Sequence, residues 1–280
     1  MAYLPDFVDT LSLNTQMATL RHLNQILSLG IASIAVGGIL TLQTSRLQGF
    51  KQSYNAKSPP SQLEQQQQRT QSRLIAISKM PSFGFENLIA SWSFLQFLQY
   101  FGDTSARRQT GYGLSPYFFE AIIPKDPYHL RPYIFLSSST SAHAAMPARA
   151  IALMDEGLIH MNPSLPSDSY LVWRYKGLDE FLFLGDYTAA QVSLETAADW
   201  VQQSETPDRE IIANSLRQTS QFLAQNPTGK EAQIGAWAQV LVQAADEATQ
   251  KIATEHIEAL GGEIIISETG QVSVRYRSTD

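Results

Sequence analysis

A long uncharged run near the N-terminus limits what this chain can fold into. From Leu23 to Ser45 no residue is charged, and Arg21 and Arg46 bound the run, with His22 at its start. A helix of these 23 residues is roughly 35 Å long at about 1.5 Å per residue, which covers a hydrocarbon core of about 30 Å. We therefore expect a membrane-spanning helix at residues 23–45, preceded by a short N-terminal segment at 1–22.

Two other interpretations of this run stay open, a cleaved signal peptide and a buried core helix. The apolar region of a signal peptide is usually about 7 to 15 residues long and follows a short basic segment, whereas Asp6 and Asp9 precede this longer run. Within it, small residues fall on neighbouring turns, at Gly30, Ser33 and Gly37. That spacing predicts a face on which another membrane helix packs closely.

Charge is unevenly distributed along the chain. The net charge is -6 and the pI about 5.4, which argues against a nucleic-acid partner. Residues 43–83 nevertheless carry a balance of +5. An excess of Lys and Arg beside a span favours the cytoplasmic side, so we expect a single-pass protein with its large C-terminal part on the cytoplasmic face of a plasma or thylakoid membrane.

Residues 46–82 form a basic linker rich in Gln and Pro. Its stretch from Ser58 to Ser72 reads SPPSQLEQQQQRTQS and buries little apolar surface, so we expect a flexible or partly helical spacer.

A repeated pattern begins at about residue 83, where apolar residues recur at helical spacing between loops rich in Gly, Pro, Asp and Ser. Residues 40 positions apart match in type: Tyr133 with Trp173, Ala150 with Ala190, Met154 with Leu194, and Gly157 with Ala197. A period of 20 to 50 residues is typical of solenoids, in which each helix pair stacks on its neighbours. The sequence thus predicts a mainly α protein with an antiparallel helix-pair solenoid at 83–203.

The best copy, Tyr170 to Trp200, resembles a tetratricopeptide repeat. It has the aromatic, small and bulky residues of that family in order, at Trp173, Gly177, Leu178, Phe181, Gly185, Asp186, Tyr187, Ala190, Leu194 and Ala197. The Gly177-Leu178 pair stands in reverse of the family order, and no proline follows the second helix near Gln202. We expect Gly185 to end the first helix in a left-handed conformation and Asp186 to cap the second.

Two further regions complete the chain. Residues 204–262 predict C-terminal helices that cap the solenoid or pack along it, one of them a long helix from Thr228 towards Gly261. Residues 263–280 alternate around Gly270 and predict a short β-hairpin tail.

The sequence offers no constellation of catalytic or metal-ligating residues, and it has no cysteine. We therefore predict no catalytic residues, no metal site and no cofactor. The tetratricopeptide resemblance instead implies that the first helices of the copies line a concave face that binds protein partners. The residues it places there are Trp92, Gln96, Tyr100, Phe135, Ser139, Tyr175, Asp179 and Phe183. The alternative is that these aromatic residues form the core between repeats.

These features predict a membrane-anchored adaptor, scaffold or assembly factor whose partners are protein subunits of a membrane complex. Membrane-anchored proteins of the family that this chain resembles help to assemble such complexes, and photosynthetic complexes are among them. A permanent accessory subunit of the complex is a second interpretation, and an enzyme with an unrecognised site is a third.

Overall fold

A computed structural model describes residues 30, 33, 36–39, 60–226, 230–266 and 272–276. The chain divides into two units, residues 1–59 and 60–280. In the first unit the six described residues, which include Gly30, Ser33 and Gly37, are helical and exposed. None of the helices within the described ranges combines the length and the apolarity that crossing a membrane requires. The rest of the segment predicted at 23–45 lies outside those ranges, so the span stays a prediction.

The second unit is mainly α-helical with a small antiparallel sheet, as the sequence predicts for this part of the chain. Its described elements, in chain order, are α2 (Pro60–Lys79), α3 (Glu86–Gly102), α4 (Thr104–Thr110), α5 (Ser115–Ile122), α6 (Arg131–Leu136), the π-helical segment η1 (Ser137–His143), α7 (Pro147–Leu158), α8 (Tyr170–Asp179), the π-helical segment η2 (Glu180–Leu184), α9 (Tyr187–Gln203), α10 (Arg209–Gln225), α11 (Lys230–Gln243), α12 (Glu247–Ala259), β1 (Gly262–Ile266) and β2 (Val272–Tyr276). In the hairpin Gly262 pairs with Tyr276 and Ile266 with Val272.

The second half of the predicted linker is a packed helix. Helix α2 packs on α5, and Leu74 is fully buried in the core. Leu63, Gln67, Thr70 and Ile77 are partly buried, and their spacing places them on the same side of the helix as Leu74. A few apolar residues at helical spacing are therefore enough to dock a Gln-rich helix.

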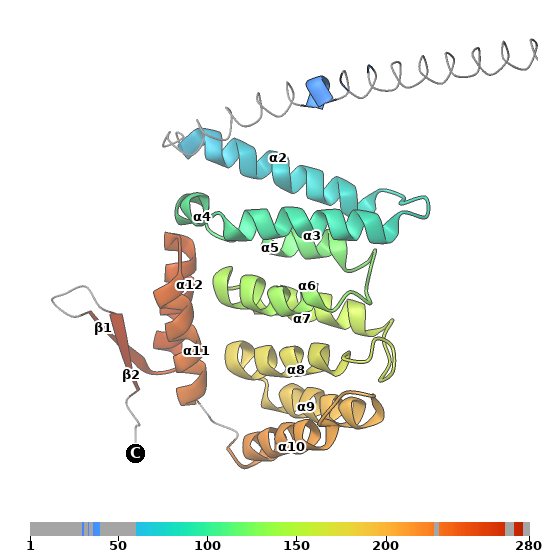
Figure 1. Cartoon of the computed structure of the whole chain (residues 1–280). Coiled ribbons are helices and arrows are strands. Elements are labelled where there is room, and N and C mark those ends of the chain that lie inside the picture. The colour runs from blue at the N-terminus through green and yellow to red at the C-terminus, as the bar shows by residue number, and fades with distance from the viewer. Residues whose placement is uncertain are drawn as a thin grey trace, which may run out of the picture. The chain divides into compact units, whose positions relative to one another are not determined.

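Helix pairs follow one another through the second unit (Figure 1). Helix α3 packs on α5, η1 on α7, and α8 on α9, while α10 packs on α9. The corner between η2 and α9 has the predicted chemistry, because Gly185 is left-handed with φ of 67° and the Asp186 carboxylate accepts a hydrogen bond from the Ala189 amide at 3.0 Å. Both local predictions are confirmed.

Small residues let the helices of the third pair approach closely. Ala190 and Ala197 are fully buried on α9. A Cβ added to Gly177 on α8 would lie 3.0 Å from Leu194 Cγ and 3.2 Å from the Ala190 carbonyl oxygen. Close packing on this face explains why the sequence repeats small residues there.

The predicted long C-terminal helix is two helices. Helix α11 ends at Gln243 and α12 begins at Glu247, where the Asp246 side chain caps α12 by accepting hydrogen bonds from the Thr249 amide and hydroxyl at 3.0 and 2.8 Å. Because the chain turns at this break, the second helix folds back on the first. Helix α11 packs against η1 and η2, and α12 packs on α11. Figure 1 shows this pair lying across the ends of the stacked helices, with the hairpin outside it.

Candidate binding surfaces

The residues predicted for a concave partner-binding face lie in different environments. Trp92 is 60% exposed, and the Gln96 side chain accepts a hydrogen bond from Arg73 of α2 at 2.7 Å. Ser139 and Asp179 are buried, with 0% and 1% exposure. Among the residues predicted for this face, only Trp92 is classed as exposed in the described structure. Partner binding by the predicted residues as a set stays a prediction.

The other aromatic residues of the predicted row pack inside the unit. Tyr100, Phe135 and Tyr175 contact the core around α3, α5 and α7, and Phe183 contacts the C-terminal core. The Phe135 ring lies 5.7 Å from that of Phe94 and 5.8 Å from that of Phe97, edge to face. This packing is the arrangement that the alternative interpretation describes.

Asp179 is the centre of a buried polar cluster that the sequence did not predict as such. Its carboxylate accepts hydrogen bonds from Ser137 at 2.8 Å and from Ser141 at 2.5 Å. Burial raises the pKa of Asp179 to about 6, although the two serine hydrogen bonds act in the opposite direction. Because both serines belong to η1, the cluster joins two successive helix pairs.

A second polar cluster joins α7, α8, η2 and α9, and Lys176, Glu180 and Ser193 are its buried members. The Lys176 ammonium lies 2.5 Å from Glu180 and 3.5 Å from Asp155. The Ser193 hydroxyl donates to the other Glu180 oxygen at 2.6 Å. Each charge has an opposite charge beside it, so this cluster is explained by helix packing and leaves no group aimed at a ligand.

A groove lies between α8 and α10, with α9 as its floor. Buried Leu194 and Leu216 form the base, and the cavity is about 330 Å³ in volume. Arg174 and Leu178 of α8 line one side, and Ile211, Ile212, Ser215 and Thr219 of α10 line the other. We call this set of residues the α8–α10 groove.

The α8–α10 groove has an apolar wall with a cation beside it. Ile211 is 70% exposed although it is aliphatic. Arg174 is also exposed, and none of the carboxylates in the described ranges forms an ion pair with it. The sequence contains one indication of this surface, the neighbouring pair Ile211-Ile212. Neighbouring side chains on a helix point about 100° apart, so when one of the pair packs against the core the other is left towards solvent.

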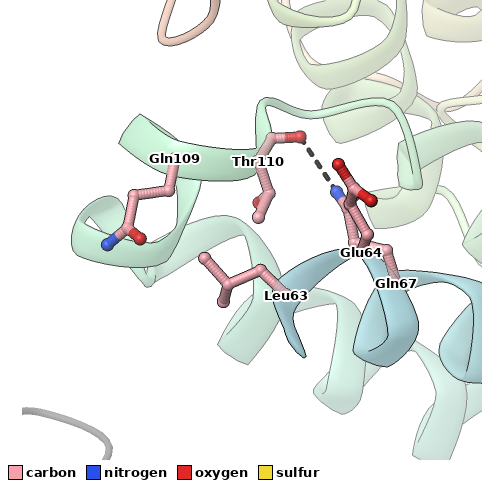
Figure 2. Close-up of a pocket in the computed structure, with 5 residues that line it drawn as sticks. All are labelled: Leu63, Glu64, Gln67, Gln109 and Thr110. Atoms are coloured by element: carbon pink, nitrogen blue, oxygen red, sulfur yellow. Dashed lines mark hydrogen bonds between the residues drawn. The ribbon is translucent and has the colours of Figure 1, made fainter. Parts of the chain in front are cut away.

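A second cavity, of about 270 Å³, lies between α2 and α4. Figure 2 shows its five lining residues, Leu63, Glu64, Gln67, Gln109 and Thr110, with the Gln67 side chain donating to the Thr110 carbonyl oxygen at 2.9 Å. That hydrogen bond ties α2 to the end of α4. With one aliphatic side chain in its lining, this cavity offers little apolar surface to a ligand.

The described ranges contain no group of three His, Asp or Glu side chains arranged to hold a metal ion. The buried carboxylate with the raised pKa, Asp179, lines neither of the two cavities.

No family model matches this chain, and neither the curated proteins nor the solved structures include a significant match to it.

Proposed function

We propose that this chain is a membrane-anchored, tetratricopeptide-like adaptor or assembly factor that holds a protein client of a membrane complex in the α8–α10 groove. The observation that carries the proposal is the exposed aliphatic wall of the groove, with Ile211 70% exposed opposite Leu178. Two features support the helical-repeat part: successive helix pairs stack through the second unit, and the Gly185-Asp186 corner has the chemistry typical of such pairs.

The lining of the groove suggests the chemistry of the client segment. An aliphatic or aromatic side chain fits between Ile211 and Leu178, because interface energy concentrates where apolar anchors fill desolvated pockets. An acidic residue close to this anchor pairs with Arg174. The proposed ligand is therefore a short helical or extended peptide segment with an apolar anchor and a neighbouring Asp or Glu.

The proposed membrane anchor is the uncharged segment at residues 23–45, with the large C-terminal part on the cytoplasmic side of a plasma or thylakoid membrane. Anchoring confines the protein to the surface on which its clients are inserted. Such confinement raises the effective concentration of client segments near the groove without adding any contact.

The test is capture of clients from membranes with a groove variant. The tagged full-length chain, Ile211→Glu and the control Val192→Glu are purified in mild detergent, and bound proteins are identified and quantified by mass spectrometry. Val192 is a matched control because it is an aliphatic residue on α9, 60% exposed, that does not line the groove. We expect one client to fall at least about tenfold with Ile211→Glu, about 1.4 kcal/mol, and to stay with Val192→Glu.

A peptide from the captured client then decides the result. Saturable binding of that peptide to the wild-type chain, lost in Ile211→Glu, supports the proposal. A set of captured proteins that is the same for both variants contradicts it.

A permanent accessory subunit is the second candidate. The small residues Gly30, Ser33 and Gly37 of the predicted span favour it, because they suit packing against another membrane helix. The two candidates differ in stoichiometry. An assembly factor co-purifies with incomplete intermediates, whereas a subunit co-purifies with the mature complex in a fixed ratio.

A further inference from the structure

Exposed apolar side chains gather on α3 and on the loop that precedes it. Between 52% and 84% of each of these side chains is exposed, and they are Met80, Phe83, Phe85, Leu88, Trp92 and Leu95. We call them the α3 patch. They lie apart from the α8–α10 groove in the sequence and share no residue with it.

Helix α3 is apolar on two opposite faces. Its inner face, with Ala90, Phe94 and Phe97, is buried in the core, while Leu88, Trp92 and Leu95 follow one another at helical spacing on the outer face. The helix carries one charged residue, Glu86, in its first turn. A surface helix usually has polar residues on its outer face. On α3 the exposed Gln99 is polar in the last turn of that face, whereas the two turns before it expose Leu88, Trp92 and Leu95, and such apolar surface is normally covered by protein or lipid.

The loop before α3 is held in a conformation that leaves two aromatic rings in solvent. Phe83 has a φ of 51°, in the left-handed region that bulky residues avoid, and 84% of it is exposed. The Lys125 ammonium secures the loop by donating to the Met80 carbonyl at 3.0 Å and to the Ser82 hydroxyl at 2.9 Å. The loop therefore presents Phe83 and Phe85 on a fixed backbone.

The charges around the α3 patch indicate what covers it. Residues 43–83 carry a balance of +5 in a chain of net charge -6. Three of these cations, Arg69, Arg73 and Lys79, are exposed on α2, which leads directly into the loop. Exposed cations beside aromatic and aliphatic side chains match the interface of a bilayer with anionic headgroups, where Trp and Phe lie at headgroup depth and basic side chains meet phosphates.

We propose that the α3 patch lies in the interfacial layer of an anionic bilayer, with Arg69, Arg73 and Lys79 at the lipid phosphates. This inference shares the membrane location with the proposed function and does not depend on the α8–α10 groove. The 14 residues from Arg46 to Pro59 reach at most about 50 Å when extended. The predicted span therefore keeps α2 within reach of the membrane surface.

The absence of cysteine from the chain allows a direct test by single spin labels. Leu88→Cys and Leu95→Cys place a nitroxide on the patch, and Val192→Cys places one on exposed α9 as the control. Each full-length variant is reconstituted in nanodiscs that contain phosphatidylglycerol. Collision of the label with oxygen, which concentrates in lipid, is compared with collision with a water-soluble nickel chelate.

We expect the ratio of oxygen to nickel collisions to be several-fold higher at Leu88→Cys and Leu95→Cys than at Val192→Cys. Weak collision with both reagents means that protein covers the patch, whether residues 23–45, a second copy or a client, and overturns the proposal. A ratio equal to that of the control means that water covers it and overturns the proposal as well.

Two further arms separate this proposal from the proposed function. In nanodiscs of phosphatidylcholine alone the ratio at Leu95→Cys should fall, and an unchanged ratio overturns the assignment of the cations to anionic headgroups. A chain that does not enter nanodiscs contradicts the membrane span. In that case the labelled chain is mixed with preformed phosphatidylglycerol vesicles. Flotation of the chain with the vesicles, together with a high ratio of oxygen to nickel collisions at the label, supports the proposed lipid contact of the α3 patch, and failure to float overturns it.

Discussion

At the scale of single residues, the buried carboxylate of Asp179 is the clearest example of a side chain whose role depends on its neighbours. The side chain is 1% exposed and joins α8 to η1 through Ser137 and Ser141. The tetratricopeptide resemblance placed Asp179 on a binding face, because helical spacing puts it one turn after Tyr175. That spacing does not reveal that η1 packs against this side of α8.

Asp179→Asn is expected to change how stability depends on pH. Burial raises the pKa from 3.8 to about 6 in the folded chain, so the folded state binds a proton that the unfolded state has released between about pH 4 and 6. The free energy of unfolding therefore falls as pH rises through this window, by up to about 3 kcal/mol, and the loss persists at higher pH. The neutral Asn side chain avoids this loss. Urea unfolding at several pH values from 4.5 to 8 measures the free energy of unfolding of the wild-type chain and of Asp179→Asn.

The control for this prediction is Glu205→Gln, which removes a carboxylate at an exposed position. We expect it to keep the pH dependence of the wild-type chain. An Asp179→Asn variant with that same pH dependence would show that Asp179 does not titrate in this range.

At the scale of elements, close approach between helices decides which small residues are required. Gly157 of α7 faces Tyr133 of α6, a residue that is 1% exposed and whose hydroxyl donates to the Pro127 carbonyl oxygen at 2.9 Å. A Cβ at residue 157 would overlap both the ring and the hydroxyl of Tyr133. The matching residue in the next copy is Ala197, which has a Cβ. The sequence pattern therefore asks for a small residue at both positions, whereas the packing against Tyr133 requires glycine at 157.

Gly157→Ala is therefore expected to destabilise the protein by about 1–3 kcal/mol, because overpacking forces the helices apart. Gly235→Ala in α11 is the matched control, since a Cβ there has no atom of the described chain within 4 Å. It should stabilise by about 0.5–1 kcal/mol by removing a helical glycine. Thermal and urea unfolding compare the two variants, and a Gly157→Ala chain as stable as the wild type or more stable would argue against close packing at Gly157.

At the scale of the whole second unit, the C-terminal helices and hairpin are joined to the helix pairs through a small core centred on Trp237. That side chain is 1% exposed. Its ring stacks on His256 of α12 with centroids 3.9 Å apart, and it meets Phe183 of η2 edge to face at 5.4 Å. One indole thus contacts both the C-terminal pair and the stacked helices.

Trp237→Ala is expected to release the C-terminal helices, with a loss of about 3–5 kcal/mol from removal of a large buried aromatic side chain. Hydrogen exchange should quicken in α11, α12 and the π-helical segments while α3 and α5 stay protected. Val242→Ala, at an exposed position of α11, is the control and should leave exchange unchanged. Faster exchange throughout the chain in Trp237→Ala would mean that the C-terminal helices are required for the whole unit to fold.

The sequence by itself determined the features that depend on local chemistry. Apolar spacing gave the helical class, and Gly185 and Asp186 marked a corner because only a flexible backbone and a short acceptor satisfy it. Only the tertiary structure decided that Leu74 docks a Gln-rich helix, that Asp179 is buried and Phe135 packs against the core, and that Trp92 and Ile211 are exposed. Those outcomes depend on which helix covers which face, and contacts between distant residues set that arrangement.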